Sequence, residues 1–150
     1  MIFGASPDEV SLASFAAKTG FSVTVCDWRE ALCNKKIFPN ADQLIVGSPQ
    51  EAVSKLQFTP RDFVVILTHQ FQRDKELLQL IVEKDLRYIG VMGSKQRTSR
   101  LLNFGELPFQ ISTPVGLTIG AEGPEEIAIS ILAELIHVKK MLLKSKVPFL

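Results

Sequence analysis

Met1-Ile-Phe-Gly-Ala-Ser-Pro-Asp-Glu9 is the stretch that decides the fold, because an apolar run ends at a glycine and a helix start follows at once. A strand that passes through a glycine turn into a helix opens a nucleotide-binding βαβ unit, whose helix N-terminus offers free N–H groups to an anion. The pattern is incomplete, since the glycine positions of G-x-G-x-x-G fall on Gly4, Ser6 and Glu9.

The start of this first helix is also specified without a ligand. Ser6-Pro7-Asp8-Glu9 has the pattern of a capping box with proline at the first helical position. Asp8 and Glu9 place negative charge where a pyrophosphate would bind. The sequence therefore leaves two interpretations open, a phosphate site at residues 4–6 or a purely structural capped turn.

The first strand is unusually short. Only three residues precede Gly4 and span about 10 Å, whereas strands usually run about five or six residues. The first strand of such a unit is normally central and fully buried. We therefore expect residues 1–150 to be one domain and a fragment of a longer protein.

Composition is that of a globular domain, with 46% hydrophobic and 22% charged residues and a net charge of +1. The near-neutral balance gives no electrostatic case for nucleic acid or a membrane surface as partner. The sequence shows neither an apolar run of about 20 residues nor a signal-peptide pattern. Two cysteines are too few for a disulfide scaffold, so we expect a cytoplasmic protein. Two histidines and no C-x-x-C pair give no basis for a metal site.

Strand-like and helix-like segments alternate along the chain. Strands are expected at residues 1–3, 21–27, 43–47, 63–69 and 87–93, and helices at 8–19, 28–33, 49–56, 73–84, 94–102 and 124–144. This alternation predicts an α/β fold, a Rossmann-like doubly wound parallel sheet of order 3-2-1-4-5 with right-handed crossovers. A long Gly/Pro-rich loop at 103–123, in which residues 115–119 could form an edge strand, precedes the C-terminal helix.

Polar or flexible residues follow four of the expected strands. They are Gly4-Ala-Ser6, Asp27-Trp28-Arg29, Thr68-His69 and Gly93-Ser94-Lys95. In parallel sheets ligands bind beyond the carboxyl ends of the strands, near the switch point between the first and fourth strands. We therefore expect the four clusters to meet at one edge.

Asp27 and Arg29 each have a binding and a local interpretation. Asp27 follows Gly4 by 23 residues, close to the spacing at which dinucleotide folds place a carboxylate on the ribose hydroxyls. The alternative is an acid that caps the next helix. Arg29 would contact a 2′-phosphate in the first case and would pair with Asp27 or Glu30 in the second.

The cluster after the fifth strand holds cations where a helix begins. Lys95 and Arg97 follow a potential cap, Ser94, and cations at a helix N-terminus oppose the helix dipole. A phosphate or an acidic partner surface would remove this conflict; a solvated basic face is the alternative. His69 is the only histidine at a strand end and could carry a proton at neutral pH, but alone it supports no catalytic role. Thr68 could bond ligand or backbone.

The chain resembles a known family, the xanthine dehydrogenase accessory proteins of the XdhC/CoxI type, in their C-terminal Rossmann-like domain. The resemblance rests on Phe3-Gly-Ala-Ser-Pro-Asp8, Thr24-Val-Cys-Asp-Trp-Arg29, Phe38-Pro-Asn-Ala-Asp-Gln-Leu-Ile-Val-Gly47, Leu67-Thr-His69 with Asp74, Tyr88-Ile-Gly-Val-Met-Gly-Ser-Lys95 and Pro114-Val-Gly-Leu-Thr-Ile-Gly-Ala-Glu-Gly-Pro-Glu-Glu126. These stretches extend from Ile2 to about Lys140, and the last is the most specific.

The resemblance implies maturation of molybdenum hydroxylases by a chaperone rather than an enzyme. Such proteins bind the molybdenum cofactor (molybdopterin), protect it during sulfuration and hand it to apo xanthine dehydrogenase or a related enzyme, with a preceding N-terminal domain contributing. The residues expected to bind the cofactor are Gly4, Ser6, Asp27, Arg29, Thr68, His69, Gly93, Ser94, Lys95 and Arg97. Ser6 departs from the family, in which many relatives carry a second glycine that lets a phosphate approach closely.

Two other functions are compatible with the sequence. One is an NAD(P)-dependent oxidoreductase in which Asp27 binds the ribose. The other is a scaffold for docking or homodimerisation, which the edge strand at 115–119 and the apolar tail at 147–150 would favour.

Overall fold

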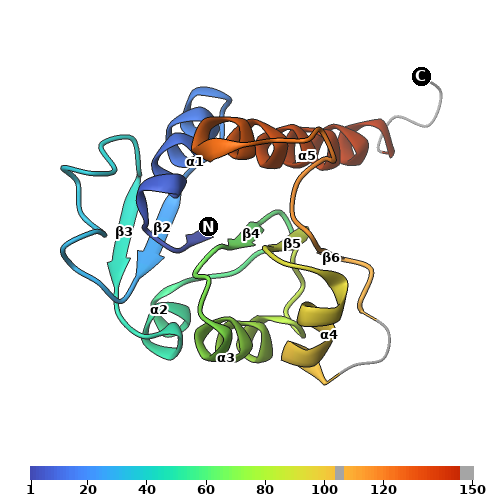
Figure 1. The fold of residues 1–150 in the computed structure, drawn as a ribbon, viewed down its shortest axis with the longest axis horizontal. Coiled ribbons are helices and arrows are strands. Elements are labelled where there is room, and N and C mark those ends of the chain that lie inside the picture. The colour runs from blue at the N-terminus through green and yellow to red at the C-terminus, as the bar shows by residue number, and fades with distance from the viewer. Residues whose placement is uncertain (104–106, 146–150) are drawn as a thin grey trace.

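A six-stranded parallel sheet forms the centre of this computed structural model, which describes residues 1–103 and 107–145, the last four by backbone alone (Figure 1). The strands are β1 (Ile2–Phe3), β2 (Thr24–Asp27), β3 (Gln43–Val46), β4 (Phe63–Ile66), β5 (Tyr88–Val91) and β6 (Ile111–Ser112). Their order is β3-β2-β1-β4-β5-β6. The predicted order 3-2-1-4-5 is confirmed, and β6 extends the sheet beyond β5.

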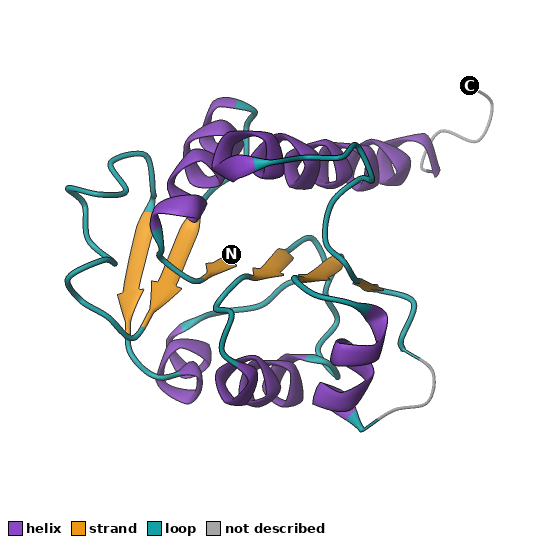
Figure 2. Cartoon of the chain, viewed as in Figure 1, coloured by secondary structure: helices purple, strands orange, loops and turns teal. Residues whose placement is uncertain are grey.

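Five helices cover the two faces of the sheet (Figures 1 and 2). The helices are α1 (Pro7–Lys18), α2 (Pro49–Lys55), α3 (Phe71–Ile81), α4 (Lys95–Leu102) and α5 (Gly123–Ser145). Helices α1 and α5 pack together on one face, and α2, α3 and α4 form a row on the other. Within residues 1–103 and 107–145, none of the helices combines the length and the apolar character that crossing a bilayer requires.

The sheet separates two apolar layers because successive side chains of a strand point to opposite faces. In β1, Ile2 packs with the residues of α1 and α5, and Phe3 packs with those of α2, α3 and α4. In β4, Val65 joins the first layer and Val64 the second. Strands buried on both faces need nearly continuous apolar sequence, which is why these segments were recognisable as strands.

The segment 28–33 forms turns instead of the predicted helix. The N–H groups of Leu32 and Cys33 donate to the carbonyl of Arg29, which closes a single turn. Asn34 then ends it, since its Nδ2 donates to the Ala31 carbonyl and its Oδ1 accepts from the N–H groups of the next turn. An asparagine that bonds neighbouring backbone groups competes with helix continuation, which is the reason that the prediction was wrong.

The edge strand predicted at residues 115–119 is also wrong, since the sixth strand is Ile111–Ser112. Pro114 offers no N–H to a strand partner. The N–H of Val115 still donates to the Val91 carbonyl of β5 at 3.0 Å, but the next two N–H groups are bonded to α5, that of Gly116 to the Glu134 carboxylate at 3.3 Å and that of Leu117 to the Ser130 carbonyl at 3.2 Å. Backbone groups bonded to a helix cannot continue a ladder. The tail at 147–150 lies outside the described residues.

Gly90 in β5 provides a stability test of this packing. A Cβ there would lie 2.6 Å from Val115 Cγ2 and 2.7 Å from Tyr88 Cε1. We expect Gly90→Ala to lower the free energy of unfolding by about 1–3 kcal/mol in urea titrations, because an inserted methyl group forces packed neighbours apart. Gly47→Ala is the control, since its Cβ would meet the exposed side chain of Glu51, and the expected change is within about 0.5 kcal/mol. Equal losses in both variants would contradict this account.

Candidate functional site

The carboxyl ends of β1, β2, β4 and β5 form one edge of the sheet. Phe3 is in register with both Cys26 and Ile66, and Ile66 with Val91, so the segments that follow these residues leave the sheet side by side. The ten residues proposed from the sequence all belong to these segments. Several of them bond to other groups of the chain.

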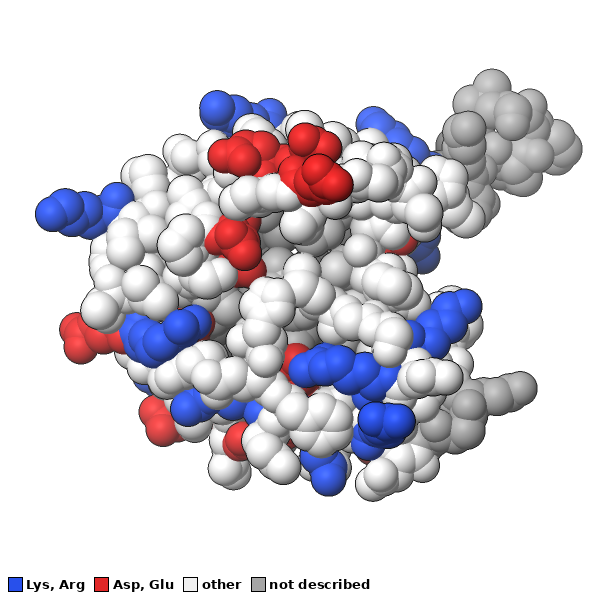
Figure 3. Space-filling model, in the orientation of Figure 1, with Lys and Arg blue, Asp and Glu red and all other residues white. Residues whose placement is uncertain are grey.

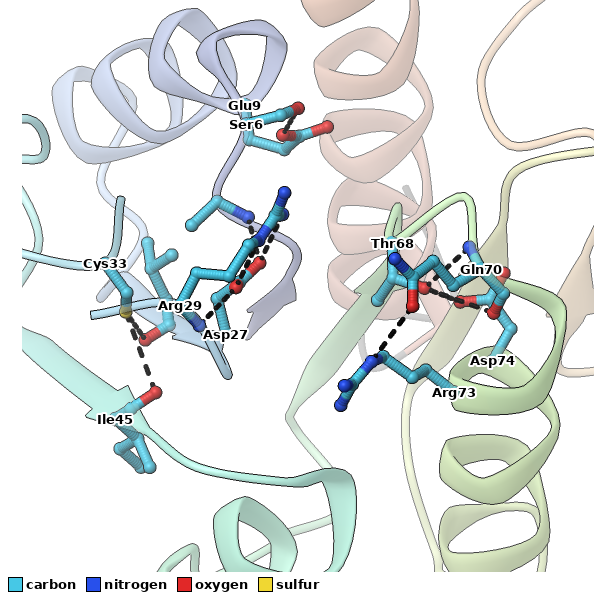
Figure 4. A network of polar contacts seen from close by, with 12 residues as sticks. Ser6, Glu9, Asp27, Arg29, Cys33, Ile45, Thr68, Gln70, Arg73 and Asp74 are labelled. Atoms are coloured by element: carbon cyan, nitrogen blue, oxygen red, sulfur yellow. Dashed lines mark hydrogen bonds and ion pairs between the residues drawn. The ribbon is translucent and has the colours of Figure 1, made fainter. Parts of the chain in front are cut away.

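Asp27 bonds to this chain's own groups at the first turn. Its carboxylate is buried and accepts hydrogen bonds from the N–H of Ala5 at 2.9 Å and the N–H of Arg29 at 2.8 Å (Figure 4). The Arg29 guanidinium adds two bonds, Nε at 3.0 Å and Nη2 at 2.9 Å. Arg29 therefore pairs with Asp27 in this structure, whereas Asp27 caps no helix, because residues 28–33 form turns. A turn amide that would bind a phosphate in a dinucleotide fold binds the Asp27 carboxylate instead.

Glu9 fills the N-terminal end of α1. It is 1% exposed, and the Ser6 hydroxyl donates to its carboxylate. The two side chains bond to each other and not to the backbone of α1, so the capping box that the sequence predicted is not formed. Burial raises the pKa of Glu9, because water no longer solvates the charged form. Residues 4–6 form a turn before α1 without a side-chain cap.

Asp74 pairs with Arg97, and sequence reasoning did not assign it to the site. It is 2% exposed and accepts from Arg97 Nη2 at 2.8 Å and from the Thr68 hydroxyl. Arg97 Nη1 also donates to the Met92 carbonyl at 3.2 Å. The unfavourable position of Arg97 at a helix start is thus offset from within the chain. Asp74 stands three residues before the apolar Leu77, and a charged residue on an inward helical stripe is the signal that could have found it.

His69 has an unusual backbone conformation at the end of the fourth strand segment. Its φ is 60°, in the left-handed region that few non-glycine residues occupy, and its side chain is exposed. His69 and Glu9 line a cavity of about 70 Å³, together with apolar residues such as Leu67 and Met92. Three side chains with ionisable groups, those of Asp8, Glu9 and His69, therefore line one small cavity.

Gly93, Ser94 and Lys95 lead into α4. Gly93 adopts a φ of 114°, which favours glycine, and its carbonyl accepts from the Thr113 hydroxyl at 2.7 Å. The Ser94 hydroxyl caps α4 by accepting from the N–H of Arg97 at 3.2 Å. Lys95 is exposed and lines a groove of about 540 Å³. It has no ion-pair partner in the described part of the chain.

Trp28 and Arg73 were both absent from the predicted set. The guanidinium carbon of Arg73 lies 3.8 Å from the Trp28 ring centroid, and that of Arg29 lies 4.3 Å from it. The cavity that Trp28 and Arg73 share with Asp27 and Thr68 has a volume of about 10 Å³. Such a volume is about the minimum for one water molecule, so a ribose would enter only if Trp28 or Arg73 moved.

Charge at this edge is unevenly distributed. Figure 3 shows a group of acidic side chains over the layer of α1 and α5, with some basic ones beside it, and side chains of both signs over the opposite helix layer. Four cations, Arg29, Arg73, Lys95 and Arg97, belong to the edge, and two of them pair with buried carboxylates. Arg73 and Lys95 therefore have no ion-pair partner among the described residues, although Asp8 and Glu9 also place carboxyl groups at this edge, and an anionic ligand suits the two free cations. Among residues 1–103 and 107–145, no three His, Cys, Asp or Glu side chains form a group that could hold a metal ion.

Comparison with known proteins gives consistent matches. The family model described as the XdhC Rossmann domain matches residues 1–135. The chain is 50% identical over 140 residues to a probable xanthine dehydrogenase subunit of Bacillus subtilis (strain 168), in a match that covers 93% of this chain and 42% of that protein. It is 30% identical over 146 residues to the molybdenum cofactor insertion chaperone PaoD of Escherichia coli (strain K12), in a match that covers 93% of this chain and 39% of that protein.

A solved structure also matches closely. The crystal structure of a xanthine dehydrogenase from Bacillus halodurans superposes with a TM-score of 0.89 and 51% identity, covering 93% of this chain and 42% of that one. The chain thus spans about two fifths of the length of these three proteins.

The pair between Asp74 and Arg97 predicts a large effect on stability. Arg97→Met removes the cation and leaves a buried carboxylate with the Thr68 hydroxyl. We expect the free energy of unfolding at pH 7 to fall by about 3 kcal/mol, because breaking a buried ion pair from one side leaves an uncompensated charge. Arg100→Met, on an exposed side chain of the same helix, should change it by less than about 0.5 kcal/mol. Losses of similar size in the two variants would show that the pair is not the cause.

The raised pKa of Glu9 predicts that the free energy of unfolding depends on pH. Its folded-state pKa is raised above the ordinary value of 4.5, so the folded chain holds this proton more tightly than the unfolded chain. The Glu9 proton therefore adds to the free energy of unfolding below pH 4.5, and this contribution is lost as the pH rises through the raised pKa. We expect Glu9→Gln to reduce this decline in denaturant titrations made at successive pH values, whereas Glu125→Gln, at an exposed position in α5, should leave it intact. Curves for Glu9→Gln that run parallel to the wild type would refute the assignment.

Proposed function

The chain belongs to the XdhC Rossmann domain family, as its motifs predicted, and on that premise we propose that it binds the anionic molybdenum cofactor for delivery to a xanthine dehydrogenase-type enzyme. The names of its relatives support this role, since one is a probable part of xanthine dehydrogenase and another is a molybdenum cofactor insertion chaperone. In this proposal the chain is an accessory protein, and the redox chemistry that the bound cofactor supplies takes place in the client enzyme.

The observation that carries the proposal is a pair of cations at the carboxyl edge of the sheet with which no carboxylate of the described residues pairs. Asp27 and Asp74 neutralise Arg29 and Arg97, while Arg73 and Lys95 have no ion-pair partner in the described residues. Molybdopterin ends in a phosphate, and a phosphate monoester carries about 1.5 to 2 negative charges at neutral pH. The residues present therefore fit the charge of the group.

The predicted site residues divide into three kinds. Residues of the first kind build the edge, because their polar groups bond within the chain or their backbone forms a turn; these residues are Gly4, Ser6, Asp27, Thr68 and Gly93. His69, Ser94 and Lys95 are exposed at the same edge, and we assign direct contact with the cofactor to them. Arg29 and Arg97 are held in place by the carboxylates that neutralise them.

The other functions derived from the sequence stay predictions. In an NAD(P)-dependent enzyme, Asp27 would have to give up its hydrogen bonds with Arg29 and with the N–H of Ala5 and accept from ribose hydroxyls instead. Nothing in the described residues favours that exchange. The companion N-terminal domain, the apo-enzyme partner and a homodimer likewise await measurement.

Lys95 provides the test of cofactor binding. We expect the wild-type chain, purified from cells that make the cofactor, to carry a pterin detectable by fluorescence after oxidation. Lys95→Glu should reduce the pterin per chain at least about tenfold, because a charge-assisted bond is worth about 1.5–3 kcal/mol and the new charge repels the anionic cofactor.

Lys55→Glu is the matched control, since Lys55 is exposed in the last turn of α2, toward the amino edge of the sheet. It should retain the wild-type amount of pterin. A wild-type chain without pterin, or equal retention by Lys95→Glu, would refute the proposed binding at this edge.

A further inference from the structure

Arg73 carries a positive charge that the described structure leaves without an ion-pair partner. The two ion pairs among the described residues join Arg29 to Asp27 and Arg97 to Asp74. Arg73 donates from Nε to the Gln70 side chain at 3.0 Å, a neutral acceptor. Its guanidinium lies over Trp28 instead of reaching into solvent.

A second guanidinium lies at the same ring. Arg29 and Arg73 stand 4.3 and 3.8 Å from the Trp28 centroid, so their charges are within about one Debye length (~8 Å) of each other. Each stack on an indole stabilises by about 0.5–1 kcal/mol at an exposed site, but like charges at this distance repel. Asp27 neutralises only Arg29. An anion bound beside the Arg73 guanidinium would offset the positive charge that remains at the stack.

The stack also orients the donors of Arg73. With Nε bonded to Gln70 and the plane held against Trp28, the two terminal Nη groups have no hydrogen-bond partner in the described part of the chain. A planar pair of N–H donors in fixed orientation is the arrangement that binds two phosphate oxygens at once. Figure 4 shows both arginines at the carboxyl side of the sheet, one from the loop after β2 and the other from α3.

The first turn, which binds phosphate in dinucleotide folds, has its donor and its space occupied by acidic side chains of this chain. Asp27 accepts from the N–H of Ala5, and Glu9 is buried in the first turn of α1. We infer that phosphate recognition is displaced from this turn to the stack of Arg29, Trp28 and Arg73, where the phosphate group of a phosphate monoester or nucleotide binds. The neighbouring cavity of about 10 Å³ is too small for it, so the phosphate lies on the outer side of the stack.

This subsite deepens the proposed function and rests on it only for the identity of the natural ligand. The phosphate chemistry can be measured alone, because Trp28 is the only tryptophan of the chain and its fluorescence reports directly on the stack. The 150-residue chain is titrated with inorganic phosphate, with cytidine monophosphate and with cytidine. We expect a saturable change with the two phosphates and none with cytidine.

Arg73→Met keeps an unbranched apolar side chain over Trp28 and removes the donors. We expect at least a tenfold increase in the dissociation constant for cytidine monophosphate, measured by equilibrium dialysis as well as by fluorescence. Arg61→Met is the matched control, because Arg61 is exposed in the turn that precedes β4, at the opposite end of that strand, and it should bind as the wild type does. Unchanged binding in Arg73→Met, or equal weakening in both variants, would overturn the inference.

Arg73→Lys covers the case in which Arg73→Met does not fold, as judged by circular dichroism. It keeps the charge but lacks the planar donor pair, so weaker binding supports the subsite and wild-type binding overturns it. The two proposals fail separately. Phosphate bound through Arg73 in a chain that carries no pterin would refute the cofactor alone, and equal pterin in wild type and Arg73→Met would refute the subsite alone.

Discussion

Two buried carboxylates determine how the carboxyl edge of this sheet is built. Asp27 and Asp74 are 4% and 2% exposed, and a buried charge is tolerated only when it is paired and hydrogen-bonded. Each therefore takes one arginine together with neighbouring donors, Arg29 with the N–H of Ala5 and Arg97 with the Thr68 hydroxyl. These pairs connect the turn after β1 to β2 and join the segment after β4 to α3 and α4. The positions of nearly all the functional candidates follow from them.

The same pairs explain why this Rossmann-like edge differs from a dinucleotide site. In a dinucleotide fold, the first turn and the start of the first helix face a pyrophosphate. Here Asp27 and Glu9 supply the acidic groups from within the chain, so an external anion is not needed there. The cations without a carboxylate, Arg73 and Lys95, lie on the opposite helix layer. In this proposal the anion is bound by the two cations that form no ion pair within the described residues. Which cations these are depends on all the ion pairs at the edge.

His69 and Glu9 add a second type of chemistry beside the charged groups. An imidazole and a carboxyl group can each bind or release a proton, and these two line one cavity between α1, α5 and the ends of β4 and β5. The left-handed backbone of His69 is a conformation that surrounding structure must hold in place, and such residues are concentrated at functional sites. A cofactor bound at this edge would lie close to these two groups.

The sequence by itself determined the layers of the fold, the order of its first five strands and the edge at which the polar clusters meet. These follow from apolar periodicity and from the handedness of crossovers, which are local properties of each segment. Only the tertiary structure decided which charges are neutralised, because Asp74 and Arg97 are 23 residues apart and meet through the packing of α3 against α4. The approach of Arg73 to Trp28 and the sixth strand were decided in the same way. Each depends on side chains and backbone groups from different segments finding partners in space, and no spacing along the chain specifies that choice.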